Sequence, residues 1–324
     1  MAHFLFQKSL GWYVWVKAVI MFKSYYVVRR FERGKSMYQV INNYRKDEVL
    51  RRSFNELAGK TFGLNFEPWY QRGFWGENYN PYSIVLDGKV VANVSVNKTD
   101  MVINGEVKHF LQLGTVMTDE AYRNRGLSRC IMEQIMADYE NKMDGMYLFG
   151  NDNVLEFYPK FGFVPAKEYL YTKKVANTGE CRLEKIVMDN EQAWKLLVEA
   201  IKGSTFPYKM YMINNPELIM FYVSSFMKES VYYHKDSDTY VIAEVEGENL
   251  FIHNVFSGRV QDLETVIGWF GQAVKEVTLG FAPWDGTDYN VAEFHEEDCT
   301  FFVRGEQLAV MEREKLRIPS LSHA

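Results

Sequence analysis

Apolar residues recur along this chain with two periods, one typical of helices and one typical of strands. Between residues 47 and 58 they recur every three or four positions, which predicts a helix with one apolar face. Between residues 82 and 116, strand-like runs are separated by Asp87-Gly88 and Asn104-Gly105, dipeptides that favour tight hairpin turns. A second helical pattern follows at 127–139. This order predicts an α/β fold, that is, an α+β mixed sheet with helices on both faces.

A similar order of elements starts again after the turn-rich segment 176–179. It opens with a strand at 182–188 and a helix at 191–201. The other elements expected in this series are a helix at 216–227, strands at 231–233, 240–245 and 250–255, a helix at 263–274, and strands at 277–280 and 301–310. We therefore predict two domains of similar topology, residues 37–177 and residues 178–324, which suits a chain of 324 residues.

The composition narrows the class of protein. Hydrophobic residues make up 47% of the chain, so it is globular rather than disordered. A formal net charge of −5 argues against a general nucleic-acid binder. The three cysteines are scattered and the histidines lack metal-ligand spacing, so we expect a cytoplasmic protein with no metal site.

Residues 1–36 differ from the rest of the chain. They hold seven Lys or Arg residues and one Glu, around an apolar aromatic run that Lys17 and Lys23 interrupt. The interruption disfavours a membrane span, and no small-residue signal-peptide cleavage site follows. The segment suits an interfacial anchor, a packed extension, or translated upstream sequence with the working start at Met37. We favour the third interpretation, because residues 32–35 can be encoded by a purine-rich stretch that resembles a bacterial ribosome-binding site.

The most informative segment joins the strand that ends near Thr118 to the helix that starts near Leu127. This short connection carries Arg123, Arg125 and Gly126. A helix that starts directly after a glycine offers its first backbone N–H groups to an anion, and a glycine, having no Cβ, lets the backbone approach that anion closely. The arginines add positive charge around the same loop. The pattern predicts a phosphate-binding loop.

A second block at 151–163 follows a strand expected at 146–149, and it places Tyr158 on a short helix. Together the two blocks resemble the GCN5-related N-acetyltransferase (GNAT) superfamily. The loop matches that family's Arg/Gln-x-x-Gly-x-Gly/Ala motif as Arg123-x-x-Gly126-x-Ser128. The second block matches the family's Asn-x-x-Ala-x-x-x-Tyr-x-Lys-x-Gly-Phe pattern through Asn151, Val154, Tyr158, Lys160, Gly162 and Phe163. Two departures are Ser128 in place of Gly or Ala, and Glu120 where proline is common.

The resemblance implies the acyl-CoA N-acyltransferase fold, with acetyl-CoA as co-substrate and direct transfer of the acetyl group to a primary amine. It implies that the pantetheine arm binds backbone groups of Val116 and Thr118, with one N–H near the thioester oxygen as oxyanion donor. The pyrophosphate is expected on the N–H groups of residues 124–128. The cofactor-binding residues implied in this way are Val116, Thr118, Arg123, Asn124, Arg125, Gly126, Leu127, Ser128 and Asn151.

The resemblance also implies a catalytic role for Tyr158, as the general acid that protonates the leaving thiolate. The alternative for Tyr158 is aromatic packing beside Phe157 and Phe161. Asn151 is expected either to bond the cofactor arm or to cap the following helix.

The second domain lacks these motifs. Its segment 256–262 stands where the loop would be and does not have the Arg-x-x-Gly-x-Gly/Ala spacing. We therefore expect a tandem pair of GNAT-like domains whose second copy is degenerate, similar to the enhanced-intracellular-survival type without its third domain.

The general base and the acceptor stay open. Glu67, Glu77, His109 and a chain of waters are candidates for the base, and the resemblance adds the terminal carboxylate of Ala324. We expect the aromatic segment 66–77 either to line the acceptor pocket or to pack over the sheet as a hydrophobic plug. The acceptor is expected to be a small-molecule or peptide amine, and neither nucleic acid nor a membrane is expected as a partner. The alternatives are a silent acyl-CoA-binding or regulatory protein, and O-acyl or longer-acyl transfer.

Overall fold

The computed structural model describes residues 29–30, 38–206 and 208–323. The expectation for residues 1–36 lies almost entirely outside this range. Only Arg29–Arg30 of that segment is described, as a short strand, β1, paired with β2. The chain divides into two compact units. The first comprises residues up to Glu67, Asn80–Ser95 and Thr115–Asp138, and the second comprises Pro68–Tyr79, Val96–Gly114 and residues from Tyr139 onward.

The first unit begins with β2 (Gln39–Asn42) and helix α2 (Glu48–Phe62). The carboxylate of Asp47 caps this helix by accepting the N–H groups of Val49 and Leu50, and Gly63 ends it with a φ of 70°. Strand β2 runs antiparallel to β3 (Tyr79–Leu86), which is followed by β4 (Lys89–Ile103) and β5 (Glu106–Thr118). Both predicted hairpin turns are found. The unit ends with the 3₁₀ turn η1 (Glu120–Tyr122) and helix α4 (Leu127–Tyr139).

The second unit contains two sheets. In one sheet, β5 runs parallel to β6 (Gly145–Gly150), and the next strands across the sheet are β16 (Thr300–Arg304) and β7 (Val164–Pro165). Strand β10 (Met210–Ile213) pairs with β4 in the same sheet. The other has the strand order β15 (Asn290–Phe294), β8 (Glu168–Lys174), β14 (Glu276–Leu279), β13 (Asn249–Ser257), β12 (Thr239–Glu246), β11 (Val231–His234) and β9 (Glu184–Ile186).

Helices and short turns complete the second unit. The helices are α3 (Glu67–Gln71, which starts in the first unit), α5 (Glu191–Lys202), α6 (Pro216–Val223), α7 (Leu263–Gly268) and α8 (Val310–Arg313). The 3₁₀ turns are η2 (Asp152–Val154), η3 (Tyr158–Phe161), η4 (Lys235–Ser237), η5 (Glu306–Ala309) and η6 (Ser320–Ser322).

The predicted repetition of element order is present. In the order β2-β3-β4-β5-β6 the last pair is parallel, and in the order β9-β11-β12-β13-β14 the last pair, β13 with β14, is parallel as well. A mixed α/β fold with two mixed sheets is therefore confirmed.

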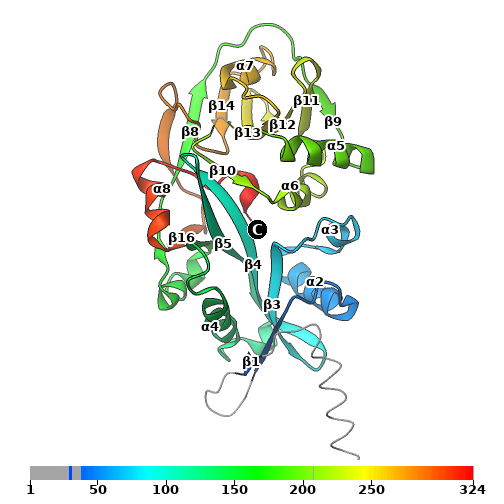
Figure 1. Cartoon of the computed structure of the whole chain (residues 1–324), viewed down its shortest axis with the longest axis vertical. Coiled ribbons are helices and arrows are strands. Elements are labelled where there is room, and N and C mark those ends of the chain that lie inside the picture. Colours follow the sequence, from blue (N-terminus) through cyan, green and yellow to red (C-terminus); the bar gives the residue numbers. More distant parts are fainter. Residues whose placement is uncertain (1–28, 31–37, 207, 324) are drawn as a thin grey trace, which may run out of the picture. The chain divides into compact units, whose positions relative to one another are not determined.

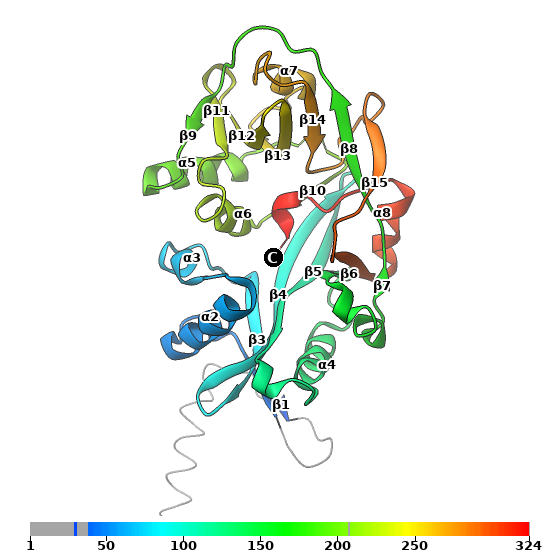
Figure 2. The same cartoon turned by 180° about the vertical axis from the view of Figure 1, so that it is seen from behind.

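The two halves of the sequence exchange strands. Strand β8 precedes the second series of elements but pairs with β14 of that series. Strand β16 follows the second series but pairs with β6 and β7. Figures 1 and 2 show β8 continuing from β7 into the second sheet, where β15 lies beside it. Strand pairing thus crosses the division proposed between residues 177 and 178.

Several element boundaries differ from the prediction, among them the end of helix α6 at Val223 rather than 227. Helix α7 ends at Gly268 rather than 274. The last strand ends at Arg304 rather than 310, because Gly305 adopts a φ of 115° and turns the chain into η5. A Cβ at Gly305 would lie 2.9 Å from the Cα of Gly145, so this turn needs a glycine for space as well.

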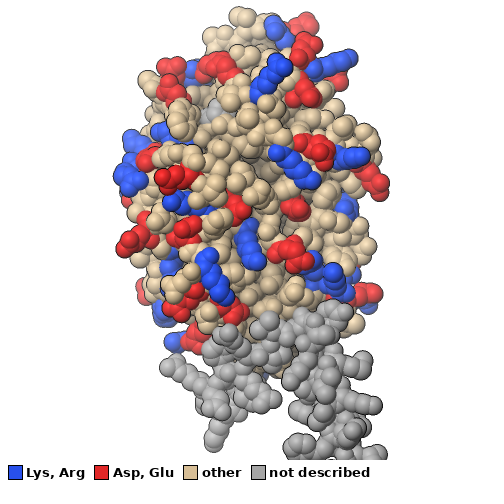
Figure 3. Space-filling view, in the orientation of Figure 1, with Lys and Arg blue, Asp and Glu red and all other residues tan. Residues whose placement is uncertain are grey.

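Among the described residues, no helix is both long and apolar enough to cross a membrane. On the face drawn in Figure 3, Lys and Arg side chains are interspersed with Asp and Glu side chains. That face therefore presents no broad field of positive charge of the kind that attracts nucleic acid.

Candidate active site

The loop between β5 and α4 belongs to the first unit and has the geometry of an anion site. Asn124 and Gly126 both have left-handed backbones, with φ of 62° and 74°. Helix α4 starts directly after Gly126, so the N–H groups of its first turn lack partners within the helix. A Cβ at Gly126 would meet no atom within 4 Å, so the space beside this glycine is open. These features fit a pyrophosphate.

Side-chain contacts hold the loop in place. The hydroxyls of Thr118 and Ser128 are hydrogen-bonded at 2.8 Å, so the serine at the family's Gly/Ala position has a definite partner across the loop. Arg125 donates to the carbonyl of Ala121 at 2.9 Å, and its guanidinium lies over the ring of Tyr122. Both backbone ends of the loop are therefore fixed while the loop itself stays exposed.

The charges around the loop are partly balanced. Arg123 donates to the carbonyl of Thr118 at 3.4 Å and lies 3.8 Å from the carboxylate of Glu120, the second departure from the family pattern. Asp119 accepts the N–H of Ala121, which lowers the pKa of that carboxyl, and lies 3.3 Å from the ammonium group of Lys60. Each acidic group next to the loop thus has a basic neighbour, which limits its repulsion of a phosphate.

Strand β5 changes conformation just before the loop. Its parallel register with β6 ends at Leu113 and Leu148, and β5 continues to Thr118. Thr115 has a φ of 48°, a left-handed conformation that is costly for a β-branched residue. Val116 and Thr118 follow this irregularity and are partly exposed. The position that the resemblance assigns to the pantetheine arm is therefore a strained segment of strand.

Tyr158 lies in the second unit, at the start of η3. Its ring is 2% exposed and contacts the rings of Phe163 and Phe302. Burial raises the pKa of the phenol to about 12, and its hydroxyl makes no hydrogen bond with any residue that the structure describes. The phenol is therefore protonated at neutral pH. Gly150 leaves room for this ring, because a Cβ there would lie 2.8 Å from Cε2 of Tyr158.

Asn151 is exposed and precedes η2. Its side chain makes no capping hydrogen bond to η2, so the structure does not support the capping role, and contact with the cofactor arm stays a prediction. The structure thus gathers Val116, Thr118 and residues 123–128 in the first unit, whereas Asn151 and Tyr158 belong to the second.

Glu67 and His109, both candidates for the general base, have well-defined structural partners. Both carboxylate oxygens of Glu67 accept hydrogen bonds from buried Arg51, at 2.7 and 3.0 Å. His109 is exposed, and a hydrogen bond to Asp100 raises the pKa of the imidazole, so that it holds its proton more tightly than a free histidine. Glu77 is exposed, and Ala324 lies outside the described residues.

The aromatic segment forms a packed cluster. Trp69, Trp75 and Tyr79 are 2 to 4% exposed, and the two indole rings stack with centroids 5.8 Å apart. The indole N–H of Trp69 donates to the carbonyl of Glu217 on α6 at 2.9 Å. Arg72 donates to the carbonyl of Ser224 at the end of that helix. This arrangement favours the interpretation of a hydrophobic plug for the part of the segment from Trp69 onward.

One groove borders Glu67 in the first unit. Its volume is about 530 Å³, and it is lined by α2 and the segment after it, with Glu48, Arg52, Asn55 and Glu56 along the helix. Glu67 lines the groove while remaining paired with Arg51.

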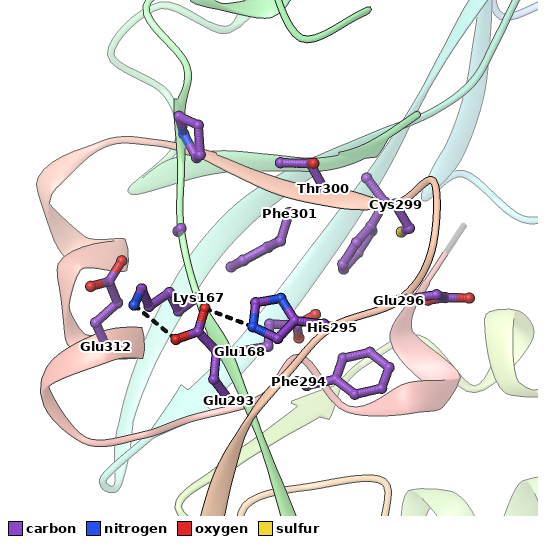
Figure 4. A pocket seen from close by; sticks show the side chains of 13 residues that line it. Lys167, Glu168, Glu293, Phe294, His295, Glu296, Cys299, Thr300, Phe301 and Glu312 are labelled. Atoms are coloured by element: carbon purple, nitrogen blue, oxygen red, sulfur yellow. Dashed lines mark hydrogen bonds and ion pairs between the residues drawn. The ribbon is translucent and has the colours of Figure 1, made fainter. Parts of the chain in front are cut away.

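The second unit has a cavity of about 330 Å³ that sequence reasoning missed (Figure 4). Strands β8, β15 and β16 form its walls, and Glu293 in one wall pairs with Lys167 at 2.8 Å and with His295 at 3.2 Å. Glu168 is 4% exposed, and burial raises the pKa of its carboxyl to about 7. The positive charge of Arg317 and the hydrogen bond from the N–H of Ile318 act in the opposite direction and lower this pKa, but the effect of burial is larger. A single Glu at the start of a strand gives no sequence signal of burial.

The second half contains a segment that is equivalent to the loop region. In this segment, side chains of the protein itself occupy backbone hydrogen-bond donors. The register of β13 with β14 ends at Ile252 and Leu279, as the register of β5 with β6 does at its equivalent place. Beyond it, the N–H of Val255 donates to the hydroxyl of Tyr208 at 2.9 Å, and the Tyr208 ring stacks on Phe281 at 3.8 Å.

The N-terminus of α7, the helix that follows this segment, is also occupied by a side chain. The carboxylate of Asp262 caps α7 by accepting the N–H of Thr265 at 3.0 Å. A carboxylate at this helix N-terminus takes up a backbone donor and repels a phosphate.

Residues 45–166 match the family model described as an acetyltransferase (GNAT) domain, so this part of the chain is a GNAT domain and the protein is an acyltransferase. A search of curated proteins finds no match to the chain.

Solved structures of similar fold cover most of the chain. One is a conserved protein from Enterococcus faecalis V583 described as a probable N-acyltransferase, with a TM-score of 0.54, 12% identity, and coverage of 89% of this chain and 74% of that one. Another is Eis1 from Mycobacterium abscessus, with a TM-score of 0.51, 11% identity, and coverage of 89% and 75%. A third is a GCN5-related N-acetyltransferase from Kribbella flavida, with a TM-score of 0.50, 14% identity, and coverage of 86% and 71%. At these identities the likeness shows a shared fold.

Proposed function

We propose that this protein is an acetyl-CoA-dependent N-acetyltransferase that moves an acetyl group to a primary amine by direct attack of the amine on the thioester, in the cytoplasm. The observation that carries the proposal is the loop Arg123 to Ser128, with open space at Gly126, positive charge around it and a helix N-terminus behind it. Residues 37–177 supply the catalytic machinery in this proposal, and residues 178–324 support it.

The residues have distinct roles. The N–H groups of residues 124–128 bind the pyrophosphate, and the backbone of Val116 and Thr118 binds the pantetheine arm. An N–H beside the arm stabilises the negative charge that develops on the thioester oxygen when the amine attacks. As the carbon–sulfur bond breaks, Tyr158 donates its phenolic proton to the thiolate. The proton that the attacking amine loses passes to water, which returns a proton to Tyr158. Asn151, exposed and without a capping bond, is available to the cofactor arm.

A test is the release of free CoA from acetyl-CoA, followed with a thiol reagent, in the presence of a panel of primary amines and amine-bearing peptides. Release that depends on an amine, with the acetylated amine identified by mass spectrometry, is the expected result. Propionyl-CoA and longer thioesters in the same assay define the acyl preference.

The second candidate is an acyl-CoA-binding protein without catalysis. The loop supports binding in either case, and Tyr158, which stands at the tyrosine of the family's motif, favours an enzyme. Acetyl-CoA binding in calorimetry without release of CoA for any acceptor would favour this candidate over the transferase.

A further inference from the structure

The strained backbone of Thr115 raises the question of what holds it. A left-handed φ of 48° in a β-branched residue persists only where surrounding contacts favour it. One such contact is a side-chain amide on the neighbouring strand. The Nδ2 of Asn93, on β4, donates to the carbonyl oxygen of Thr115 at 2.9 Å.

Asn93 is fixed by further hydrogen bonds. Its Oδ1 accepts the hydroxyl of Ser83 at 2.8 Å, and its second amide hydrogen is donated to the hydroxyl of Ser95 at 2.9 Å. The hydroxyl of Ser83 is in turn 2.6 Å from that of Tyr44. Because a carbonyl oxygen only accepts, the atom facing Thr115 must be the amide nitrogen, which fixes the orientation of the side chain.

Every side chain in this chain of hydrogen bonds is buried. Asn93 and Ser83 are 0% exposed, and Tyr44 and Ser95 are 1% exposed. Burying several polar side chains is unfavourable unless each is hydrogen-bonded, and a fully bonded buried network is rigid. The network therefore acts as a stiff support behind Thr115.

The consequence for the site comes from the geometry of the peptide bond. In a planar trans peptide, the C=O of Thr115 and the N–H of Val116 point in opposite directions. Holding the Thr115 carbonyl toward Asn93 thus directs the Val116 N–H away from Asn93. We propose that Asn93 is a positioning residue that aims the Val116 N–H at the thioester oxygen. This inference rests on the proposed function.

Asn93→Asp tests the proposal within one protein. A buried carboxyl whose hydrogen-bonding neighbours are hydroxyls and a carbonyl has a raised pKa. Its protonated form donates to the Thr115 carbonyl, and its ionised form repels that oxygen. The ratio of variant to wild-type kcat should therefore be low at pH 9, by ~10-fold to 10²-fold as for a misplaced oxyanion donor, and should rise toward unity as the pH falls. The KM for acetyl-CoA should change much less.

Ser53→Ala is the matched control, because the Ser53 hydroxyl accepts the N–H of Val90 on the same strand and is also buried. It removes a buried hydrogen bond without touching Thr115, and should leave kcat and its pH profile unchanged. If Asn93→Asp folds poorly, Ser83→Ala replaces it as the test. This variant removes the hydroxyl that donates to Oδ1 of Asn93, and it should lower kcat by a smaller factor.

The outcomes separate the two proposals. A wild-type protein that releases no CoA with any amine removes the proposed function, and this inference with it. If the wild type is active, two results contradict this inference alone. One is an Asn93→Asp variant whose kcat at pH 9 is near that of wild type. The other is a loss of kcat in Asn93→Asp that is constant with pH and equal to the loss in Ser53→Ala.

Discussion

Tyr158 combines a buried ring with a hydroxyl that has no hydrogen-bond partner among the described residues. A pKa of about 12 means that the phenol holds its proton throughout the neutral range, as a general acid must before the thiolate leaves. We expect Tyr158→Phe to lower kcat by roughly 10²-fold, within the usual contribution of general acid catalysis. The affinity for acetyl-CoA, measured by calorimetry, should be nearly unchanged.

Tyr171→Phe provides the comparison for that prediction. The Tyr171 hydroxyl donates to the carbonyl of Lys315 at 2.9 Å, and its ring is 3% exposed, so the variant also loses one hydroxyl from a largely buried ring. Its kcat should stay near that of wild type. Equal kcat values in the two variants would show that Tyr158 only packs.

Glu168 makes stability depend on pH. Burial raises the pKa of its carboxyl from 4.5 to about 7 in the folded protein, so the folded state binds this proton more tightly than the unfolded state. The stabilising contribution is fully present below pH 4.5 and is lost as the pH rises through about 7. At about 1.4 kcal/mol per pKa unit, the difference is on the order of 3 kcal/mol. Glu168→Gln should therefore flatten the fall of Tm between pH 5 and pH 8.

Glu293→Gln is the control for this measurement. Glu293 lines the same cavity, but a hydrogen bond from Lys167 lowers the pKa of its carboxyl, so this group is already ionised at pH 5. Its variant should keep the wild-type slope between pH 5 and pH 8. A Glu168→Gln protein with that same slope would contradict the assignment.

At the scale of elements, the loop before α4 is the part that a single substitution tests best. Gly126→Glu adds bulk and negative charge where the open space and the first N–H groups of α4 are expected to receive the pyrophosphate. Acetyl-CoA raises the Tm of a protein that binds it in the folded state. We expect the variant to lose that rise in a thermal-shift assay.

Gly88→Glu isolates the effect of the site from that of the backbone. Gly88 has a φ of 76°, close to the 74° of Gly126, and a Cβ at either position meets no atom within 4 Å. Both variants therefore carry similar backbone strain, and only Gly126→Glu should lose the acetyl-CoA shift. A retained shift in folded Gly126→Glu would place the cofactor elsewhere.

The loop could be predicted from the sequence because its signals are local. Gly126, the arginines and the start of α4 lie within a few residues, and their conformations depend mainly on those neighbours. Asn93 gave the opposite signal. It alternates with apolar residues on β4, a pattern typical of a solvent-facing side, yet it is fully buried because β3 and β5 supply partners. Contacts between residues distant in sequence leave no such pattern.

At the scale of the whole chain, the exchange of strands between the two halves was not predicted, because it also depends on contacts between residues distant in sequence. Strands β8 and β16 are short, and their partners lie more than a hundred residues away. The exchange means that each half completes a sheet of the other, since β16 covers the edge of β6 and β8 covers the edge of β14. A cut at residue 177 separates both pairs.

We expect the whole chain to bind one molecule of acetyl-CoA. In the second half the N–H of Val255 is bonded to Tyr208, whose ring is 2% exposed, and the N-terminus of α7 is bonded to the carboxylate of Asp262. The N–H groups of Val255 and Thr265 thus already have partners within the chain, whereas Gly126 faces open space. Calorimetric titration should give a stoichiometry near one for the wild type and no detectable binding for Gly126→Glu. A stoichiometry near two, or residual binding in folded Gly126→Glu that Tyr208→Trp weakens, would show that the second half binds acetyl-CoA as well.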